Sequence, residues 1–446
     1  MKQSNCITAA FCCVAVSFGT AVFAAGGDID ATFANNGFAI SAVDLVPGGN
    51  DSVGDLVVGV DDSVYQVGVA EDSQGWRHFI QKLNAQGGVD SSYGSSGMAF
   101  LPQADPKVGA YGALMGNGNV LVTTAEWDAT NSRLDAVLRQ YRPDGSLDAQ
   151  AFGGAGQFVL SNFPGARLEY VSDLAIDSQG RIVLAGISAR YPSLTLQMMV
   201  ARILPNGTLD TSFGGGVLQG SPIPQFDTTL RGMRVLANDD IVVGGGVKTA
   251  YDDWDFALWK IKSTGATDTS FGNSGFQTVW FDIGGLHTDF VKDLEVRADG
   301  SIFAVGRADD SNGNGNIAIA MLTPSGQLDT NFGNQSPKNG RFHMSVGGGY
   351  FNEAVSVAKR ANGSFIVALL IESGSNIDFG ALQFTSQGYL DTGFGFLGLR
   401  QYSFNYGNDE EFSTSIVVDS QDRALIGGWA GYSNSDNDLM LIRLQP

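Results

Sequence analysis

The stretch Leu209-Asp-Thr-Ser-Phe-Gly214 decides the fold, because variants of it recur along the whole chain. In each variant an Asp is followed three residues later, or four in one copy, by Phe or Tyr, and usually then by Gly. The copies lie 58 to 62 residues apart: Asp30 with Phe33, Asp90 with Tyr93, Asp148 with Phe152, Asp210 with Phe213, Asp268 with Phe271, Asp329 with Phe332, and Asp391 with Phe394. A fixed period of this length predicts one structural unit repeated along the chain.

The unit around this stretch contains four short, largely apolar runs separated by turn residues. The runs are residues 173–177, 181–186 and 199–203 and a fourth near Val217, with turns at 178–180 and 205–207. Runs that are partly apolar on both sides are typical of strands packed between two neighbouring sheets. The 60 Gly residues and the low charged fraction of 16% also favour strands joined by tight turns over helices.

Seven units of four antiparallel strands predict an all-β fold, a seven-bladed β-propeller with strands a to d counted outwards from the axis. The last unit lacks a d strand, and the chain begins with a d-type strand at residues 37–43. We therefore expect this N-terminal strand to complete the last blade beside the c-type strand at residues 438–444. The alternative is an open solenoid, which would carry distinct capping repeats that the sequence does not display.

The recurring pattern Asn/Asp-Gly-x-Leu-Asp-x-Ser-Phe-Gly-x-x-Gly resembles the bacterial delta-60 repeat family over residues 28–446. The resemblance implies a propeller and no established common reaction. The departures are small: Ala34 follows Phe33, Tyr93 replaces Phe, Thr267 replaces Leu, and the copy from Asp148 to Phe152 has one extra residue.

Residues 1–24 have the features of a secretory signal peptide: Lys2, an apolar stretch from about Ile7 to Phe23, and a cleavage pattern ending at Ala24. Cleavage after Ala24, or else after Ala25, would leave residues 25–446 as the propeller. The chain has three cysteines, and all of them lie in the signal: Cys6, Cys12 and Cys13. The mature chain would therefore have neither disulfides nor thiolate sites. We expect export to the periplasm, the cell surface or the medium; an uncleaved membrane anchor is the alternative.

The chain is acidic, with 46 Asp and Glu against 26 Lys and Arg and a formal net charge of −20. Such a charge repels nucleic acid and anionic membranes, which argues against both as partners. The negative charge favours solubility, or else it indicates a preference for cations or basic proteins as partners.

The repeated Asp is expected to accept backbone N–H groups in a turn, and the aromatic residue to wedge between blades. A ring of metal-binding aspartates is the functional alternative. Because strands reverse at each turn, the b–c and d–a loops share one face, and their length and variety predict that ligands bind there.

The loops of that face are acidic and aromatic, a combination suited to sugar rings or to cationic partners. The candidate ligand-binding residues are Trp76, Trp127, Asp128, Asp252, Asp253, Trp254, Asp282, His287 and Asp289. A glycan or a basic protein is the partner that these residues suggest, and a solvated acidic rim is the alternative.

Catalytic and metal-binding patterns are sparse. Asp310 to Asn316 resembles the start of a calcium loop, but Met321 stands where a bidentate Glu is needed, so a Gly/Asn hairpin is the preferred interpretation. The three histidines form no zinc cluster or catalytic triad, and His287 alone is a candidate for a test. We therefore expect no cofactor, with calcium as the alternative.

These patterns predict an exported propeller that acts as a binding module. The alternatives are a carbohydrate- or lactone-directed hydrolase or lyase with carboxylates at the mouth of the axis, and a purely structural surface protein. An enzyme should bring unrepeated polar residues together at the axis, whereas a binding module should carry an acidic and aromatic patch over several blades.

Overall fold

The computed structural model describes residues 26–446 except 103–108, 161–165, 191–193, 251–252, 282, 285–287, 335–337, 348–349, 375, 405–409 and 434–435. The signal peptide expected at residues 1–24 therefore lies outside the described residues. Apart from one short helix, α1 (Ala151–Gly154), the described elements are all β-strands. No helix in the described part of the chain is long and apolar enough to cross a membrane.

The strands form antiparallel meanders of four. Five sheets have four strands each, and one eight-stranded sheet joins two such meanders through a single parallel pair, Leu168 with Leu134. From the inner strand outwards, the first three meanders are β2 (Asp51–Val58), β3 (Val64–Asp72), β4 (Gly75–Leu83) and β5 (Met98–Phe100); β6 (Tyr111–Leu114), β7 (Val120–Asp128), β8 (Arg133–Tyr141) and β9 (Gln157–Leu160); and β10 (Ala166–Ile176), β11 (Ile182–Arg190), β12 (Leu196–Ile203) and β13 (Val217–Gly220).

The remaining meanders follow in the same order along the chain. They are β14 (Thr228–Val235), β15 (Ile241–Ala250), β16 (Asp253–Ile261) and β17 (Phe276–Val279); β18 (Asp289–Val296), β19 (Ile302–Asp309), β20 (Gly315–Leu322) and β21 (Arg341–Met344); β22 (Asn352–Lys359), β23 (Phe365–Ser373), β24 (Asn376–Phe384) and β25 (Leu399–Tyr402); and β26 (Glu411–Val418), β27 (Ala424–Ser433), β28 (Asp436–Leu444) and β1 (Phe38–Ser41).

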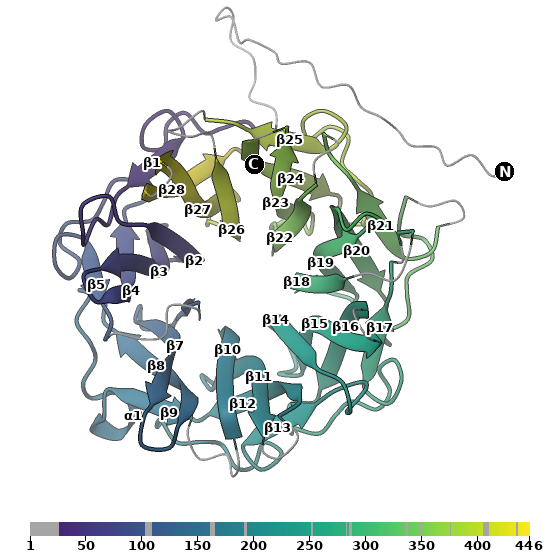
Figure 1. Cartoon of the computed structure of the whole chain (residues 1–446), viewed down its shortest axis with the longest axis horizontal. Coiled ribbons are helices and arrows are strands. Elements are labelled where there is room, and N and C mark those ends of the chain that lie inside the picture. Colours follow the sequence, from purple (N-terminus) through teal and green to yellow (C-terminus); the bar gives the residue numbers. More distant parts are fainter. Residues whose placement is uncertain are drawn as a thin grey trace, which may run out of the picture.

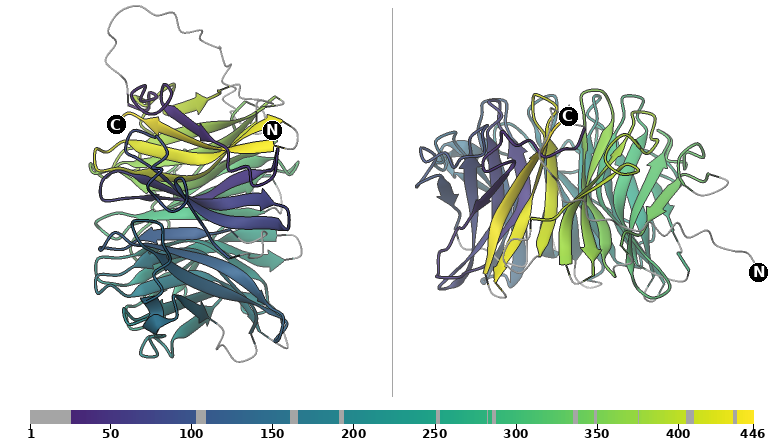
Figure 2. Two further views of the ribbon diagram at one scale, coloured as in Figure 1. Left: turned by 90° about the vertical axis from the view of Figure 1, so that its left-hand side faces the viewer. Right: turned by 90° about the horizontal axis from the view of Figure 1, so that it is seen from above.

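The sheets stand side by side around a central axis, with the first strand of each meander innermost (Figure 1). Each innermost strand contacts the next one around the axis, and β26 contacts β2. Seen from the side, the strands run between two faces that carry the turns and loops (Figure 2).

The hydrophobic core lies between neighbouring sheets. All eight residues of β20 are buried, because this strand is covered on both sides. Across one such boundary the Phe303 ring of β19 stacks on the Phe365 ring of β23, with their centroids 4.5 Å apart. Stacked aromatic pairs of this kind add to the free energy gained from burial alone.

The repeated aromatic residues lie at the boundaries between sheets. Six of the seven are buried: Phe33, Tyr93, Phe213, Phe271, Phe332 and Phe394. Gly87 of the next sheet has a φ of +85°, and a Cβ added there would lie 2.7 Å from the Phe33 ring, so only glycine fits. The backbone N–H of Ala34 also donates to the Gln86 carbonyl at 2.7 Å, which joins the two sheets.

Phe152 departs from this pattern because its copy has one extra residue. The insertion forms α1, where Phe152 has a φ of +53° and is only half-buried. A hollow of about 430 Å³ lies beside it, lined among others by Gln140, Asp148 and Asn206.

The N-terminal segment takes the place of an outer strand beside the last sheet. Strand β1 pairs with β28 from Phe38 opposite Ile442 to Ser41 opposite Leu439. The Asp30 N–H donates to the Arg443 carbonyl at 2.8 Å, as the Asp210 N–H does to Arg202 within one sheet. The first copy of the phrase therefore uses the last c strand of the chain as its partner.

Candidate functional site

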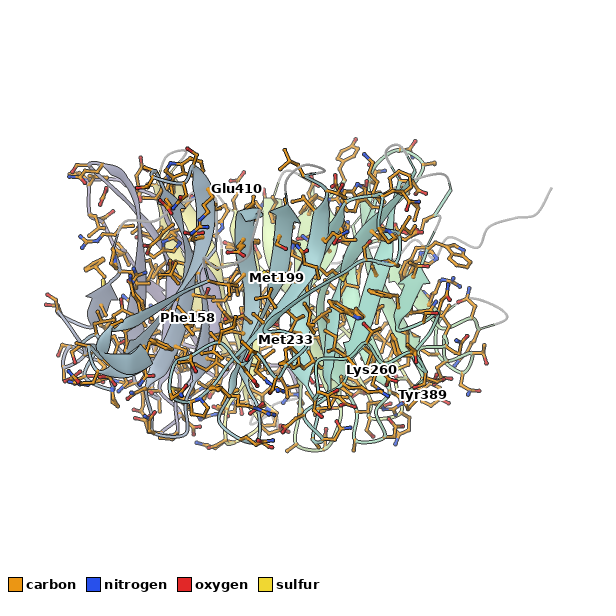
Figure 3. All side chains as sticks on the ribbon, turned by 90° about the horizontal axis from the view of Figure 1, so that it is seen from below. Phe158, Met199, Met233, Lys260, Tyr389 and Glu410 are labelled. Atoms are coloured by element: carbon orange, nitrogen blue, oxygen red, sulfur yellow. The ribbon has the colours of Figure 1, made fainter. Side chains whose placement is uncertain are left out.

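The b–c and d–a loops meet on one face of the molecule through backbone pairing. Isolated parallel bridges join Trp254 to Thr288, Gly315 to Phe351, and Ile377 to Glu410. In each bridge the start of a c strand pairs with the segment that leads into the next innermost strand. Figure 3 shows Glu410 at this loop face and Lys260 and Tyr389 at the opposite one.

Trp127 and Asp128 lie at the tip of the β7–β8 hairpin on the loop face. The Trp127 side chain is 61% exposed, although Trp is usually buried. The Asp128 carboxylate accepts the N–H groups of Thr130 and Asn131, at 2.9 and 3.1 Å, and pairs with Arg133 at 3.6 Å. Asp128 therefore holds its own hairpin and leaves Trp127 as the exposed group.

Asp253, Trp254 and Asp289 are brought together where β16 meets the segment leading into β18. The Trp254 ring lies 6.1 Å from the Phe290 ring, and Asp253 accepts a hydrogen bond from the Thr249 hydroxyl at 2.6 Å. Asp289 is buried and accepts the Phe281 N–H at 2.8 Å. Asp51, which begins β2, accepts the Val43 N–H in the same way, so this carboxylate position recurs as a loop support.

The other candidates do not join this group. Trp76 is half-buried on β4, opposite Glu71 of β3, and belongs to a different sheet from Trp127. Asp252, Asp282 and His287 lie outside the described residues. Among the described residues, no group of three or more His, Cys, Asp and Glu side chains could hold a metal ion. The Asp310 carboxylate accepts the N–H groups of Asn312 and Asn314, so it closes its own turn.

A second cluster, which the sequence did not single out, lies on the innermost strands. Asp55, Asp173 and Asp293 each follow a β-bulge in strand a. Each carboxylate reaches the next innermost strand and accepts a backbone N–H there, from Gly112, Met233 and Val357 at 3.0, 2.6 and 3.0 Å. The carboxylates that follow the bulges thus tie neighbouring innermost strands to one another.

Arg234 of β14 lies among these carboxylates. Its guanidinium contacts Asp293 at 3.2 Å, Glu295 at 3.0 Å and Asp173 at 3.9 Å. It also donates to the Val357 carbonyl of β22 at 3.4 Å, which links strands two sheets apart. Arg234 is thus a central cation that partly neutralises the axial carboxylates.

Confinement at the axis changes the acidity of this cluster. Burial raises the pKa of Asp55 to about 6, although the hydrogen bonds from the Gly112 and Leu56 N–H groups lower it. Burial, with smaller contributions from Asp293 and Asp55, raises the pKa of Asp173 to about 8 although Arg234 opposes the change. The protonated form of Asp173 is therefore favoured much more strongly than that of an ordinary aspartate.

The sequence did contain a signal for this cluster. Asp-Leu stands at the same point of strand a in the first, third and fifth units, at Asp55, Asp173 and Asp293. In the unit between the last two, the apolar run is interrupted by Leu230-Arg-Gly-Met-Arg234. Two arginines in an innermost strand are the unrepeated feature that would have pointed to the axis.

Comparisons with known proteins support the fold. Residues 178–213 and 297–332 match the family model of a domain of unknown function described as a β-propeller, DUF5122. No curated protein matches the sequence. The two matched segments cover less than half of the chain, and they support a β-propeller repeat family.

Solved structures resemble the chain over most of its length. An ulvan lyase, a polysaccharide lyase bound to a saccharide, has a TM-score of 0.50 and 9% identity, with 94% of each chain covered. A protein of unknown function from Dyadobacter fermentans has a TM-score of 0.49 and 10% identity, with 92% of this chain and 98% of that chain covered. Identities this low show only that the folds are alike.

Proposed function

We propose that the chain is an exported, seven-bladed β-propeller that acts as a binding module through its loop face. In this proposal residues 1–24 are removed as a signal peptide and residues 25–446 form the propeller. The pairing of β1 with β28 and the contact between β26 and β2 support a ring of seven blades closed by the N-terminal strand. We keep the delta-60 repeat family as the proposed relationship.

The observation that carries the binding function is the exposure of large aromatic side chains on fixed loops. Trp127 is 61% and Tyr350 is 72% exposed, and the Tyr350 carbonyl accepts the Gly315 N–H at 2.9 Å. Exposed aromatic side chains on ordered backbone are typical of interaction sites, because they gain a large buried area on binding at little entropic cost. The acidic loops beside them favour a neutral glycan or a basic protein.

A binding screen with matched variants tests this function. The mature protein is screened against a glycan panel and basic peptides, and hits are measured by calorimetry for the wild type and for Trp127→Ala/Tyr350→Ala. We expect the double variant to bind at least about tenfold more weakly, because both exposed aromatic rings are removed. Tyr389→Ala is the control, since Tyr389 is 52% exposed on the opposite face. Equal losses in both variants, or no ligand at all, would contradict the proposal.

A hydrolase or lyase acting on a carbohydrate or lactone is the second candidate. The observation that favours it is the convergence of Asp55, Asp173 and Arg234, because a carboxyl group with a raised pKa can act as a general acid near neutral pH. Incubation of polysaccharides with the wild type and with Asp173→Asn distinguishes the two functions. Product release that depends on Asp173 would support an enzyme, whereas binding without turnover would support the binding module.

A further inference from the structure

The extra residue in the copy of the phrase that begins at Asp148 changes which side chain takes the wedge position. In another copy, the Phe213 N–H donates to the Asp210 carbonyl at 3.0 Å, and this hydrogen bond marks the aromatic wedge. The residue that donates to the Asp148 carbonyl, at 2.9 Å, is Ala151. The Ala151 carbonyl also accepts the N–H of Gly156, the last glycine of the phrase, at 3.0 Å. A methyl group therefore stands where the other six copies have an aromatic ring.

Phe152 is the inserted residue, and its ring lies outside the wedge position. Its backbone is left-handed, with φ +53° and ψ +47°, a conformation that bulky residues rarely adopt. A Cβ added at Gly207 of the next sheet would lie 2.3 Å from the Phe152 Cα. The backbone of Phe152 thus covers this glycine, whereas the Phe33 ring covers Gly87 in the first copy. The Phe152 ring instead lies 6.5 Å from the Phe158 ring of β9, the outermost strand of its sheet (Figure 1).

The hollow of about 430 Å³ beside Phe152 lies at this boundary between the second and third meanders. Both meanders contribute apolar lining: Met115 and Ala151 come from the second, and Ile182 and Pro205 from the third. An apolar hollow left where a small side chain replaces a large one can take up a small aromatic molecule. The volume also lies within the range of small-ligand pockets, about 300–1,000 Å³. The apolar side of the hollow is therefore suited to an aromatic ring.

The polar side of the hollow differs from most other copies in a second group. In four of the other copies, the c-strand residue whose carbonyl accepts the phrase Asp N–H is a cation that pairs with the Asp carboxylate: Lys82, Arg202, Lys260 and Arg443. Three of these cations also lie over the aromatic ring of the phrase, 4.3 to 5.9 Å from its centre. In the Asp148 copy this residue is Gln140, and its amide donates to Asp148 Oδ2 at 3.2 Å.

The Asp148 carboxylate lines the hollow, and its basic partner lies at the surface. Arg142 contacts Asp148 Oδ1 at 2.8 Å, and the Arg142 side chain is 46% exposed, so solvent weakens this ion pair. The Oδ2 atom faces Gln140, where both neighbouring copies have a Lys or Arg. This boundary therefore contains neither the aromatic wedge nor the cation that the neighbouring copies supply, but it keeps the carboxylate that such a cation contacts.

We propose that this hollow binds a small aromatic cation of the arylalkylamine class. The aromatic ring of the ligand fills the wedge position beside Ala151 and Ile182, and its ammonium group contacts Asp148 where other copies place a Lys or Arg. The ligand thus supplies the two groups that the chain itself supplies at the neighbouring boundaries. The hollow lies among the a–b and c–d turns, on the face opposite the loop face, so binding there does not depend on Trp127 or Tyr350.

Calorimetry on the mature protein tests the site with four probes that separate the ring from the charge. They are 2-phenylethylamine, the uncharged 2-phenylethanol, the anionic phenylacetate, and butylamine, which has the charge without the ring. We expect 2-phenylethylamine to bind at least about tenfold more tightly than each of the other three, because only this probe has both groups.

Deletion of Gln150 is the most direct variant, because it restores the spacing Asp-x-x-Phe-Gly-x-x-Gly to this copy. Phe152 should then enter the wedge position and fill the hollow. Binding of 2-phenylethylamine should weaken at least about tenfold, while the Tm should equal or exceed that of the wild type. Ala151→Leu places a larger side chain at the hollow without a change of chain length, and it should weaken binding in the same way. The matched control is Ala149→Leu, since Ala149 is exposed and lies outside the lining of the hollow. It should bind like the wild type.

Several outcomes would overturn the proposal. They are no binding of 2-phenylethylamine, equal affinity for 2-phenylethanol or for butylamine, and unchanged affinity in a folded deletion variant or in Ala151→Leu. If the deletion variant does not fold, Ala151→Leu and its control decide the question. Trp127→Ala/Tyr350→Ala should bind 2-phenylethylamine normally, so failure of the loop-face function and failure of this site can be told apart.

Discussion

Each phrase aspartate is fixed by its own turn, and several are also held by a basic side chain from the adjacent c strand. Arg443 contacts Asp30 at 2.8 Å, and its guanidinium lies 4.4 Å from the centre of the Phe33 ring. Arg202 holds Asp210 at 2.8 Å and lies 4.3 Å from the centre of the Phe213 ring. One arginine therefore joins the turn aspartate and the aromatic wedge into a single buried contact.

Replacing the arginine leaves the buried carboxylate without its cationic partner, so it should destabilise the protein. Arg443 and Asp30 are only 4% and 2% exposed, so Arg443→Met should lower the free energy of unfolding by about 3–5 kcal/mol. The control Arg142→Met breaks a pair whose arginine is 46% exposed and should cost at most about 1 kcal/mol. Urea denaturation of both variants measures the difference, and equal losses would contradict a structural role for the buried pair.

Asp173 should make stability fall as the pH rises. Its pKa is about 8 in the folded protein and about 3.9 in an unfolded chain, so between these values the folded state binds more protons. The free energy of unfolding therefore decreases from about pH 4 to about pH 8. Asp51 and Asp55, with pKa values of about 7 and 6, act in the same direction.

Melting temperatures across this range measure the effect in the wild type and in Asp173→Asn. We expect a flatter profile for the variant, because the amide does not titrate. Loss of the contact with Arg234 would shift the variant curve as a whole without changing its slope. Parallel curves between pH 4 and pH 8 would contradict the raised pKa.

At the scale of the element, the c–d turn of one sheet packs against the phrase of the preceding sheet. A Cβ at Gly265, which has a φ of +85°, would lie 2.5 Å from the Gly214 nitrogen and 2.6 Å from the Phe213 carbonyl carbon. Gly180 has a similar φ of +74°, but nothing lies within 4 Å of its Cβ position. Both glycines thus have a backbone conformation that is unfavourable for an L-residue. Only Gly265 also lies in a close contact between two sheets.

Alanine substitutions at these two positions should distinguish the effect of the backbone conformation from the effect of the contact between sheets. Gly180→Ala should cost about 1–2 kcal/mol, the price of a left-handed backbone for an L-residue. Gly265→Ala should cost about 1–3 kcal/mol more, because the tightly packed turn must also move. Thermal unfolding monitored by circular dichroism compares them, and equal destabilisation would refute the tight packing of the Gly265 turn against the preceding sheet.

Individual strands could be predicted from the sequence because the repeat supplied several aligned examples. The run at residues 199–203 lies within β12, and the N-terminal run at 37–43 contains β1. The loop face also followed from strand direction alone. Phe152 could not be placed this way, since one inserted residue changes the local backbone and leaves its ring only partly buried at the edge of the core.

At the scale of the whole molecule, the local pattern marks the axial aspartates and arginines but does not reveal that they come together. Asp55, Asp173 and Asp293 lie about 120 residues apart along the chain and meet only because the sheets stand around one axis. Their register depends on a bulge in each strand, which composition does not reveal. Conversely, Trp76 and Trp127 looked alike in sequence but differ in exposure, because hairpin geometry decides which ring reaches solvent.

An engineered disulfide between β1 and β28 shows whether the N-terminal strand closes the ring. Ala39 lies opposite Leu441 in the β1–β28 pair, and residues 25–446 contain no native cysteine. Under mild oxidation, Ala39→Cys/Leu441→Cys should form an intramolecular disulfide in the monomer. The out-of-register control Ala39→Cys/Leu439→Cys should form far less, because diagonal positions are too distant for good geometry. Free thiols or cross-linked dimers in the first variant would contradict a ring closed by this strand.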